Sequence, residues 1–260
     1  MASARRRFKP MSRHEEYINE LLEEKYTLEK SLKSSEYMQI DLYSHVESGK
    51  KLLKLLSVNR NDDIFRRLCG RKCPNLPLIY EVCAFEKGLC VLEEYIEGRQ
   101  LSEILAEGTL SQGDALSYFF DICSALSFLH AHSVIHRDVK PANIIITPDG
   151  RAVLIDLNSS REYSSEVDGD TVNLGTPGYA APEQFGIHQS TPATDIYALG
   201  ILLNEMLLDI SPIVKTPEGR LGKIIKKCIS SQISERYQSI GELTNDLEAY
   251  RRKHPIKAKK

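Results

Sequence analysis

One stretch constrains this chain more than any other: Val134–Ile146, which reads VIHRDVKPANIII. An apolar run leads into a turn that carries a carboxylate, a cation and an amide at Asp138, Lys140 and Asn143, and a second apolar run follows. Another carboxylate, Asp156, comes 13 residues after Asn143, at the end of a further apolar run. A plain polar loop between two buried strands predicts neither the D-x-x-x-x-N spacing nor a second acid at a strand end.

These side chains suit the handling of a phosphoryl group and its magnesium ions. Asp138 would accept the proton of an attacking hydroxyl, and Asp156 would hold the metal that bridges the phosphates. Asn143 would hold a second metal, and Lys140 would neutralise the transferred group. The stretch therefore predicts the transfer of a phosphoryl group to a hydroxyl group.

Composition sets broad limits. The chain has 260 residues, enough for one large domain or two small lobes that share an interface. Its net charge of −2 implies no general attraction to nucleic acid or membranes, and no apolar run predicts a membrane span. Basic residues gather at both ends, in Arg5–Arg7 and among Lys257, Lys259 and Lys260. We expect solvated tails there, with docking to an anionic partner as the alternative.

The six cysteines show no paired C-x-x-C spacing, so a zinc site is not predicted. No signal peptide is visible at the start of the sequence. We therefore expect reduced thiols and a cytoplasmic location.

Apolar periodicity predicts a small β-rich part followed by a larger helical part, an α+β organisation. We expect an N-terminal extension over 1–25, basic and partly helical, a first lobe over 26–94, a second over 95–252 and a basic tail over 253–260. Helices are predicted at 14–24, 62–68, 101–107, 111–132, 194–208, 221–228 and 240–252. Strands are predicted at 26–32, 39–46, 51–57, 77–84 and 89–94.

The motif and this order of elements resemble the eukaryotic-like (Hanks-type) serine/threonine protein kinase family over roughly residues 26–252. The resemblance implies the bilobal protein kinase fold, ATP and Mg²⁺ as cofactors, and a protein substrate with serine or threonine. It implies that Asp138, Lys140 and Asn143 are catalytic and that Asn143 and Asp156 hold metal. The nucleotide-binding residues it implies are Lys54, Glu94, Ile96, Ile145 and Asp156.

The segment Leu174–Glu183, LGTPGYAAPE, is similar to the end of a kinase activation segment. The resemblance implies that Thr176 bridges Asp138 and Lys140, and that Glu183 pairs with Arg236. It also implies that Asp195 supports the backbone at His136 and Arg137, and that a phosphate neutralises Arg137. Thr171 is the preferred phosphosite, ahead of Ser159, Ser160, Ser164 and Ser165. The amino-acid sequence of these segments resembles that of bacterial kinases of this family, which favours a bacterial origin.

The first lobe departs from the family pattern. Lys33–Met38 contains no glycine where a glycine-rich loop would cover the phosphates. Leu52 replaces a small residue above the adenine, and Asn158 replaces the glycine two residues after Asp156. The helix position that usually supplies a glutamate to the lysine is Ile64. Asp62, Asp63 or Glu93 is the alternative partner for Lys54.

Three functions therefore stay open. The first is an active serine/threonine protein kinase, because every residue that touches the metal and the hydroxyl is present. The second is a pseudokinase that acts as a binding or allosteric module, suggested by the departures in the first lobe. The third is a small-molecule phosphotransferase, which Lys140 and the Ala181–Glu183 segment disfavour. The sequence does not name the substrate or the oligomeric state.

Overall fold

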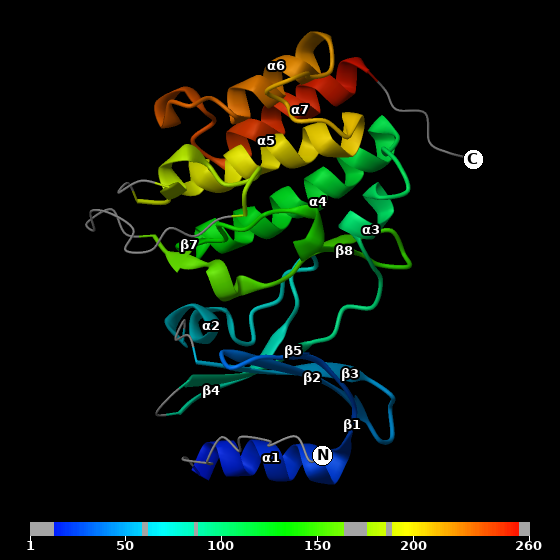
Figure 1. Cartoon of the computed structure of the whole chain (residues 1–260), viewed down its shortest axis with the longest axis vertical. Helices are drawn as coiled ribbons and strands as arrows, with labels where there is room; N and C mark the ends of the chain where they lie inside the picture. Colours follow the sequence, from blue (N-terminus) through cyan, green and yellow to red (C-terminus); the bar gives the residue numbers. More distant parts are fainter. Residues whose placement is uncertain (1–12, 59–61, 86–87, 164–175, 186–188, 255–260) are drawn as a thin grey trace. The chain divides into compact units, whose positions relative to one another are not determined.

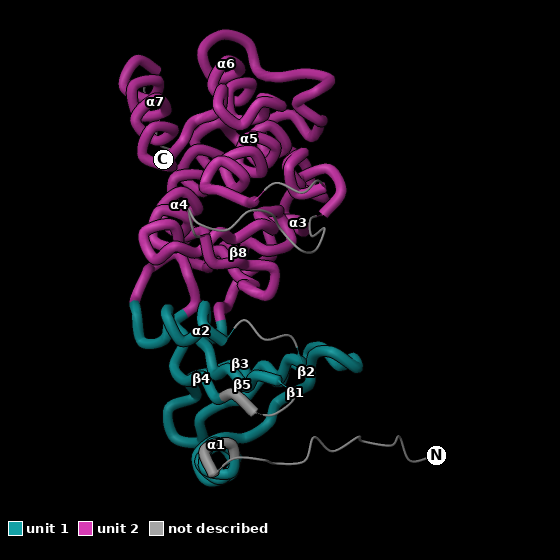
Figure 2. The backbone as a smooth tube through the Cα atoms, turned by 90° about the vertical axis from the view of Figure 1, so that its left-hand side faces the viewer, with its two compact units in different colours: residues 1–71, 78–95 teal, residues 72–77, 96–260 magenta. Residues whose placement is uncertain are grey.

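The computed structural model describes residues 13–58, 62–85, 88–163, 176–185 and 189–254 (Figure 1). The chain divides into two compact units (Figure 2). Unit 1 comprises residues 1–71 with 78–95, and unit 2 comprises residues 72–77 with 96–260. The basic chain ends and the predicted phosphosite Thr171 lie outside the described residues.

Unit 1 is a five-stranded antiparallel sheet with two helices. The sheet has the strand order β1-β2-β3-β5-β4. Figures 1 and 2 both show α1 and α2 on opposite faces of this sheet. The predicted strand at 51–57 and helix at 62–68 are confirmed residue for residue. The elements are α1 (Arg13–Lys25), β1 (Tyr26–Ser34), β2 (Met38–His45), β3 (Lys51–Ser57), α2 (Asp62–Leu68), β4 (Ile79–Phe85) and β5 (Gly88–Glu94).

Strand alternation in β3 assigns its side chains to the two faces of the sheet. Leu52 and Leu56 pack in one cluster with Ile18 and Leu22 of α1, so the even-numbered positions of β3 face α1. Lys54 therefore shares the α1 face. Burial of an aliphatic side chain contributes roughly 1.5–3 kcal/mol, so α1 is held to the sheet mainly by its apolar side chains.

The turn between β1 and β2 closes without glycine. The Ser35 backbone N–H donates to Met38 O at 2.8 Å, and the Ser35 hydroxyl accepts from the Met38 N–H at 3.1 Å. The Ser35 side chain thus stabilises the turn by a hydrogen bond to the backbone, in a type of turn that often contains a residue with positive φ. The predicted glycine-free segment forms an ordinary hairpin turn.

Unit 2 is mainly helical. Its helices are α3 (Leu101–Leu105), α4 (Gln112–Ala131), α5 (Pro192–Leu208), α6 (Gly219–Cys228) and α7 (Ile240–Lys253). Its short strands are β6 (Arg99–Gln100), β7 (Val134–Ile135), β8 (Ile144–Ile146), β9 (Ala152–Leu154) and β10 (Arg161–Glu162). Short 3₁₀ turns are η1 (Pro141–Asn143), η2 (Leu157–Ser159), η3 (Pro182–Phe185) and η4 (Ile233–Glu235).

The long helix α4 begins where the sequence predicts it to begin. Ser111 is its N-cap, and the Asp114 N–H donates to the Ser111 hydroxyl at 3.2 Å. Its buried residues include Leu116, Phe119 and Leu126, which form part of the core of unit 2. None of the helices in the described part of the chain combines the length and the apolar composition that a membrane crossing requires.

Candidate active site

The catalytic candidates lie on a loop that two buried strands hold at its ends. β7 pairs with β10, and β8 pairs with both β6 and β9. Between them the side chains of Asp138, Lys140 and Thr176 form a closed triangle. Lys140 Nζ donates to Asp138 Oδ2 at 2.8 Å and to Thr176 Oγ1 at 2.7 Å, and Thr176 Oγ1 donates to Asp138 Oδ1 at 2.7 Å. The bridge that the resemblance implied for Thr176 is thus present.

Asn143 joins this triangle from the 3₁₀ turn η1. Its Nδ2 donates to both the backbone oxygen and Oδ2 of Asp138, each at 2.9 Å. Burial opposes ionisation of Asp138, but hydrogen bonds from Lys140, Thr176 and Asn143 outweigh it and lower the pKa of the carboxyl group. Asp138 is therefore a fixed carboxylate at neutral pH.

Asp156 occupies a left-handed backbone conformation, with φ 70° and ψ 84°. Such a conformation is uncommon for a residue other than glycine and is often found at functional sites. The backbone N–H and Nδ2 of Asn158 donate to Asp156 Oδ1 at 3.1 Å and 2.5 Å. The residue that replaces the family's glycine therefore orients the carboxylate it follows.

The donor set of this unit fits magnesium. Asp156 is exposed and supplies carboxylate oxygens, and Asn143 directs its amide nitrogen to Asp138, which leaves its amide oxygen as a ligand. Mg²⁺ is usually bound by one or two protein oxygens, with phosphates and water completing the shell. Among the described residues, no group of three or more His, Cys, Asp or Glu side chains could hold a metal ion on its own.

Asp195 fixes the backbone just before the catalytic aspartate. Its carboxylate accepts the backbone N–H groups of His136 at 2.9 Å and Arg137 at 2.8 Å. His130 Nε2 lies 2.8 Å from the same carboxylate and must donate, because a carboxylate only accepts. Burial opposes ionisation of Asp195, but the hydrogen bond from His130 helps to lower its pKa. Arg137 itself is buried and has φ 69°, another left-handed residue beside the site.

Glu183 and Arg236 form the pair that the resemblance implied. Arg236 Nη1 donates to Glu183 Oε1 at 2.7 Å and Nη2 donates to Oε2 at 2.9 Å, a bidentate contact with both side chains buried. Thr194 Oγ1 donates to the same Oε1 at 2.9 Å. Burial opposes ionisation of Glu183, but its bonds to Arg236 lower the pKa. The end of the activation segment is thereby fastened to the helical core.

The remaining nucleotide candidates lie at the end of β5, in the segment that follows it and in strand β8. Glu94 ends β5, where its Oε2 accepts the Leu78 N–H at 3.1 Å. Ile96 is buried, and Ile145 is half-buried in β8. A Cβ on Gly98 would lie 2.3 Å from the carbonyl oxygen of Ile146. Only glycine permits this close approach of the chain to β8.

Lys54 has a different environment from the one expected of a phosphate ligand. Its Nζ donates to Asn19 Oδ1 of α1 at 2.5 Å, and the residue is only 9% exposed. In the register of β3 and β5, Lys54 is paired with Leu92 and Leu53 with Glu93. Glu93 therefore lies on the opposite face of the sheet from Lys54, so the expected pairing of these two residues is not formed. Leu52 also belongs to the α1 cluster instead of facing an adenine site.

One of the minor phosphosite candidates is corrected as well. Ser160 is 4% exposed, and its hydroxyl donates to the backbone oxygen of His136 at 3.5 Å. A kinase needs an accessible hydroxyl, so a buried side chain of this kind is a poor target. Ser164 and Ser165 lie outside the described residues.

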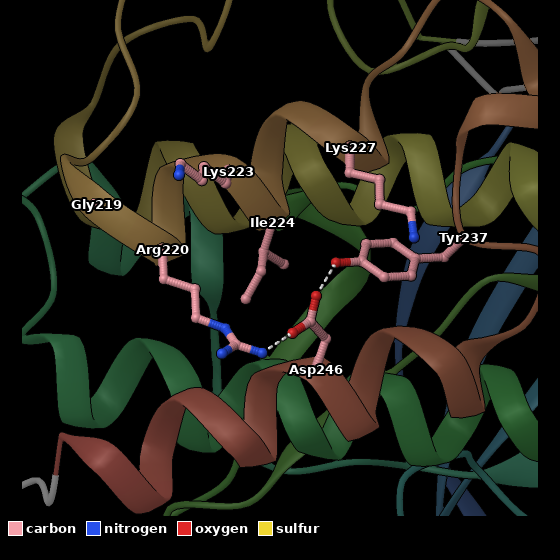
Figure 3. Close-up of a pocket in the computed structure, with 7 residues that line it drawn as sticks. All are labelled: Gly219, Arg220, Lys223, Ile224, Lys227, Tyr237 and Asp246. Atoms are coloured by element: carbon pink, nitrogen blue, oxygen red, sulfur yellow. Dashed lines mark hydrogen bonds and ion pairs between the residues drawn. The ribbon is translucent and has the colours of Figure 1, made fainter.

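The described residues of unit 2 line cavities that include the following two. One of about 610 Å³ adjoins the Asp138 network, since Lys140 and Thr176 line it together with Tyr179, Glu205 and Asp209. The other, of about 480 Å³, lies between α6 and α7 (Figure 3). There Asp246 accepts hydrogen bonds from Arg220 and, at 2.6 Å, from the Tyr237 hydroxyl. This second cavity shares no residue with the catalytic loop and is braced by its own ion pair.

Several contributors escaped the sequence prediction. His130 and Gln184 support the loop backbone, Gln184 by donating Nε2 to Arg137 O at 3.0 Å. Asn158 orients Asp156, and Asn19 binds Lys54. The spacing of Asn158 from Asp156 offered a local signal. The contacts of His130, Gln184 and Asn19 join residues that are distant in the sequence, and no sequence motif predicts them.

Asp138, Lys140, Asn143 and Thr176 together form the arrangement that characterises the catalytic loop of the protein kinase architecture. The chain belongs to the protein kinase family: residues 28–252 match the protein kinase domain. It is similar to the serine/threonine-protein kinase PrkC of Bacillus subtilis, with 34% identity over 66% of this chain and 28% of that protein. The serine/threonine-protein kinase PknB of Mycolicibacterium smegmatis is 29% identical over 67% of this chain and 31% of that protein.

The chain is also similar to kinases from outside the bacteria. The CBL-interacting serine/threonine-protein kinase 26 of Arabidopsis thaliana is 28% identical over 80% of this chain and 50% of that protein. A bacterial origin therefore stays a prediction. The matched regions cover between 28% and 50% of the length of these relatives, so the comparison concerns the kinase domain they share.

Proposed function

We propose that this chain transfers the γ-phosphoryl group of ATP to serine or threonine hydroxyl groups of a protein. The closed network of Asp138, Lys140, Thr176 and Asn143 is the observation that carries this proposal. A kinase site of this type works by positioning and by electrostatic stabilisation, and both require side chains that are held before the substrate arrives. The serine/threonine kinases to which the chain is similar support the same reaction class.

Asp138 is the proposed base. It would orient the acceptor hydroxyl and take its proton as the hydroxyl oxygen bonds to the γ-phosphorus and the bond to the β–γ bridging oxygen breaks. Lys140, 2.8 Å from Asp138, would place positive charge beside the transferred group. Magnesium and ATP, when bound, supply the phosphoryl group and the charge neutralisation that Asp156 and Asn143 would secure through their oxygens.

The cavity that adjoins Lys140 and Thr176 is the proposed acceptor site. Its volume of about 610 Å³ leaves room for side chains of a peptide. Glu94, Ile96 and Ile145 are the proposed contacts of the nucleotide base. Thr171 stays the preferred site of a regulatory phosphate, with Arg137 as its proposed partner.

A binding module without transfer is the second candidate. It is favoured by one specific observation: Lys54, the residue at the family's phosphate-binding position, is bonded to Asn19. Both candidates predict a folded kinase domain, but they differ in whether the chain binds ATP with magnesium and transfers phosphate.

The decisive experiment compares the wild type with Asp138→Asn. We expect transfer of radiolabelled phosphate from ATP to fall by about 10²–10⁴-fold, the usual contribution of a general base, while the thermal shift caused by ATP with magnesium persists. Glu248→Gln, an exposed carboxylate on α7, is the matched control and should transfer at the wild-type rate. A wild type that shows neither a thermal shift at millimolar ATP nor transfer supports the binding module instead.

A further inference from the structure

Lys54 is a buried cation whose ammonium group has a partner in α1. Among the described residues, Asn19 Oδ1 is the hydrogen-bond acceptor of Lys54 Nζ, at 2.5 Å, and Lys54 is 9% exposed. A buried ammonium group is costly unless its hydrogen bonds are satisfied. The amide of Asn19 therefore contributes to holding Lys54 in its place and α1 on the sheet.

A buried carboxylate lies on the same face. Asp41 of β2 is directly opposite Lys54 of β3 in the strand register and is 6% exposed. Its Oδ2 accepts from Gln39 Nε2 at 2.6 Å, while its Oδ1 is buried and has no hydrogen-bond partner among the residues that the structure describes. Side chains directly opposite on antiparallel strands have Cβ atoms about 4.5–5.5 Å apart. The α1 face of the sheet therefore carries a buried cation and a buried carboxylate at directly opposite strand positions.

Apolar contacts close over these charges. Ile18 and Leu22, on either side of Asn19 in sequence, are each 2% exposed and pack against Leu52 and Leu56, the β3 neighbours of Lys54. The end of α1 is tied as well, because the Val46 N–H donates to Lys25 O at 2.9 Å. The helix is thus fixed by its side chains and by its backbone.

We propose that Lys54 is a polar anchor that, in addition to the apolar contacts, docks α1 on the sheet, and that this face of unit 1 is an intramolecular binding site for the N-terminal helix rather than a contact for nucleotide phosphates. The helix that usually supplies the partner of the family's lysine corresponds to α2, and α2 lies on the opposite face of the sheet (Figure 1). Glu93, the other expected partner, also lies on that opposite face. The part of this inference that concerns ATP binding rests on the proposed function.

The test measures amide hydrogen exchange along α1 in the full chain. Lys54→Met and Asn19→Ala each remove one side of the contact, and each should speed exchange over residues 16–25 about tenfold, as expected for a hydrogen bond to a charged group. The double variant should exchange no faster than the single variants, because both remove the same interaction. Lys51→Met is the matched control: Lys51 lies on the same strand, but on the other face, and its ammonium is 3.6 Å from Glu29.

The second readout is the dissociation constant of ATP with magnesium. If Lys54 only anchors α1, the dissociation constant of Lys54→Met should differ from the wild-type value by less than about twofold. If Lys54 is a phosphate ligand, the dissociation constant should rise by about tenfold or more. Unchanged exchange in both single variants, or that tenfold rise, overturns the proposal. If Lys54→Met fails to fold, Asn19→Ala alone decides, since it leaves the lysine in place. If the wild type binds no ATP, the proposed function fails, while the exchange data still decide the anchor.

Discussion

The two units hold their charged groups in different ways. In unit 2, Asp138, Asp195 and Glu183 each accept two or more hydrogen bonds from partners within the unit. In unit 1, the buried side chains of Lys54 and Asp41 make fewer hydrogen bonds, and within the described part of the chain Asp41 Oδ1 has no hydrogen-bond partner. Apolar packing of α1 on the sheet supplies most of the order around that pair.

This difference separates two tasks. The carboxylates of unit 2 are charged, held in fixed positions and, at Asp138, accessible, which suits a reaction that depends on positioning. The charges of unit 1 are covered by a helix, which suits assembly of the unit. In the proposed function, groups of unit 2 would therefore carry the kinase chemistry, and unit 1 departs from the family pattern where Lys54 contacts α1.

The largest effect is expected from breaking the buried pair of unit 2. Glu183→Gln would leave Arg236 buried without its carboxylate partner, so we expect the free energy of unfolding to fall by about 3–5 kcal/mol. Urea denaturation followed by circular dichroism measures this loss. The pair also carries pH dependence: the pKa of Glu183 is lowered, so its contribution is complete above the ordinary pKa and is lost as pH falls through the lowered one.

The matched control is an exposed ion pair of the same unit. Arg99 Nη2 and Glu107 Oε1 are 2.5 Å apart, with both side chains more than half exposed. Glu107→Gln should change the unfolding free energy by less than about 1 kcal/mol. Equal losses in the two variants would show that burial of Glu183 and Arg236 does not set their contribution.

A smaller loss is expected from the α1 interface of unit 1. Leu22→Ala removes a side chain that is 2% exposed in the cluster with Leu52 and Leu56, and such truncations cost about 2–4 kcal/mol. Tyr17→Ala, on the same helix but 60% exposed, should cost less than about 0.5 kcal/mol. Both values come from urea titrations. Equal stability of the two variants would mean that α1 is not part of the folded core of unit 1.

Much of the architecture follows from local sequence. The helix at 62–68 and the strand at 51–57 were predictable because apolar periodicity and breakers coincide there. The contacts of Thr176 and Arg236 were predictable for another reason: they belong to motifs in which residue type and spacing are tied to one geometry. Local pattern and motif therefore account for the strands of unit 1, for the main helices of both units and for the contacts of Thr176 and Arg236. The short strands β6 to β10 were not predicted.

The environment of Lys54 was not predictable by that route. A lysine two residues after Leu52 fits the family's motif, and sequence spacing does not reveal which face of a strand a helix covers. The face depends on the register of β3 with β5 and on the packing of Ile18 and Leu22, both long-range properties. His130 escaped prediction for the same reason, because it meets Asp195 across 65 residues of chain.

The smallest effect concerns pH and His136. Asp138 N donates to His136 Nδ1 at 3.3 Å, and His136 Nε2 lies 3.3 Å from Ile155 O, an arrangement that requires the neutral ring with its proton on Nε2. Burial lowers the pKa of His136 from its ordinary 6.5, although the carboxylates of Asp195, Asp156 and Asp138 oppose this shift. Between the lowered pKa and 6.5, His136 is therefore protonated in the unfolded chain and neutral in the folded chain. The stability that results is complete above pH 6.5 and is lost as pH falls through the lowered value.

His136→Gln removes this proton uptake and isolates its contribution. Between pH 7.5 and 5.5 the unfolding free energy of the wild type should fall more steeply than that of the variant, by at most about 1.4 kcal/mol per pH unit, the limit for one proton. Parallel curves from urea titrations would mean that His136 takes up its proton equally in the folded and unfolded chain. That result would mean that the neutral His136 ring does not help to position Asp138. Asp195 and Gln184 would then be the residues that hold the loop backbone.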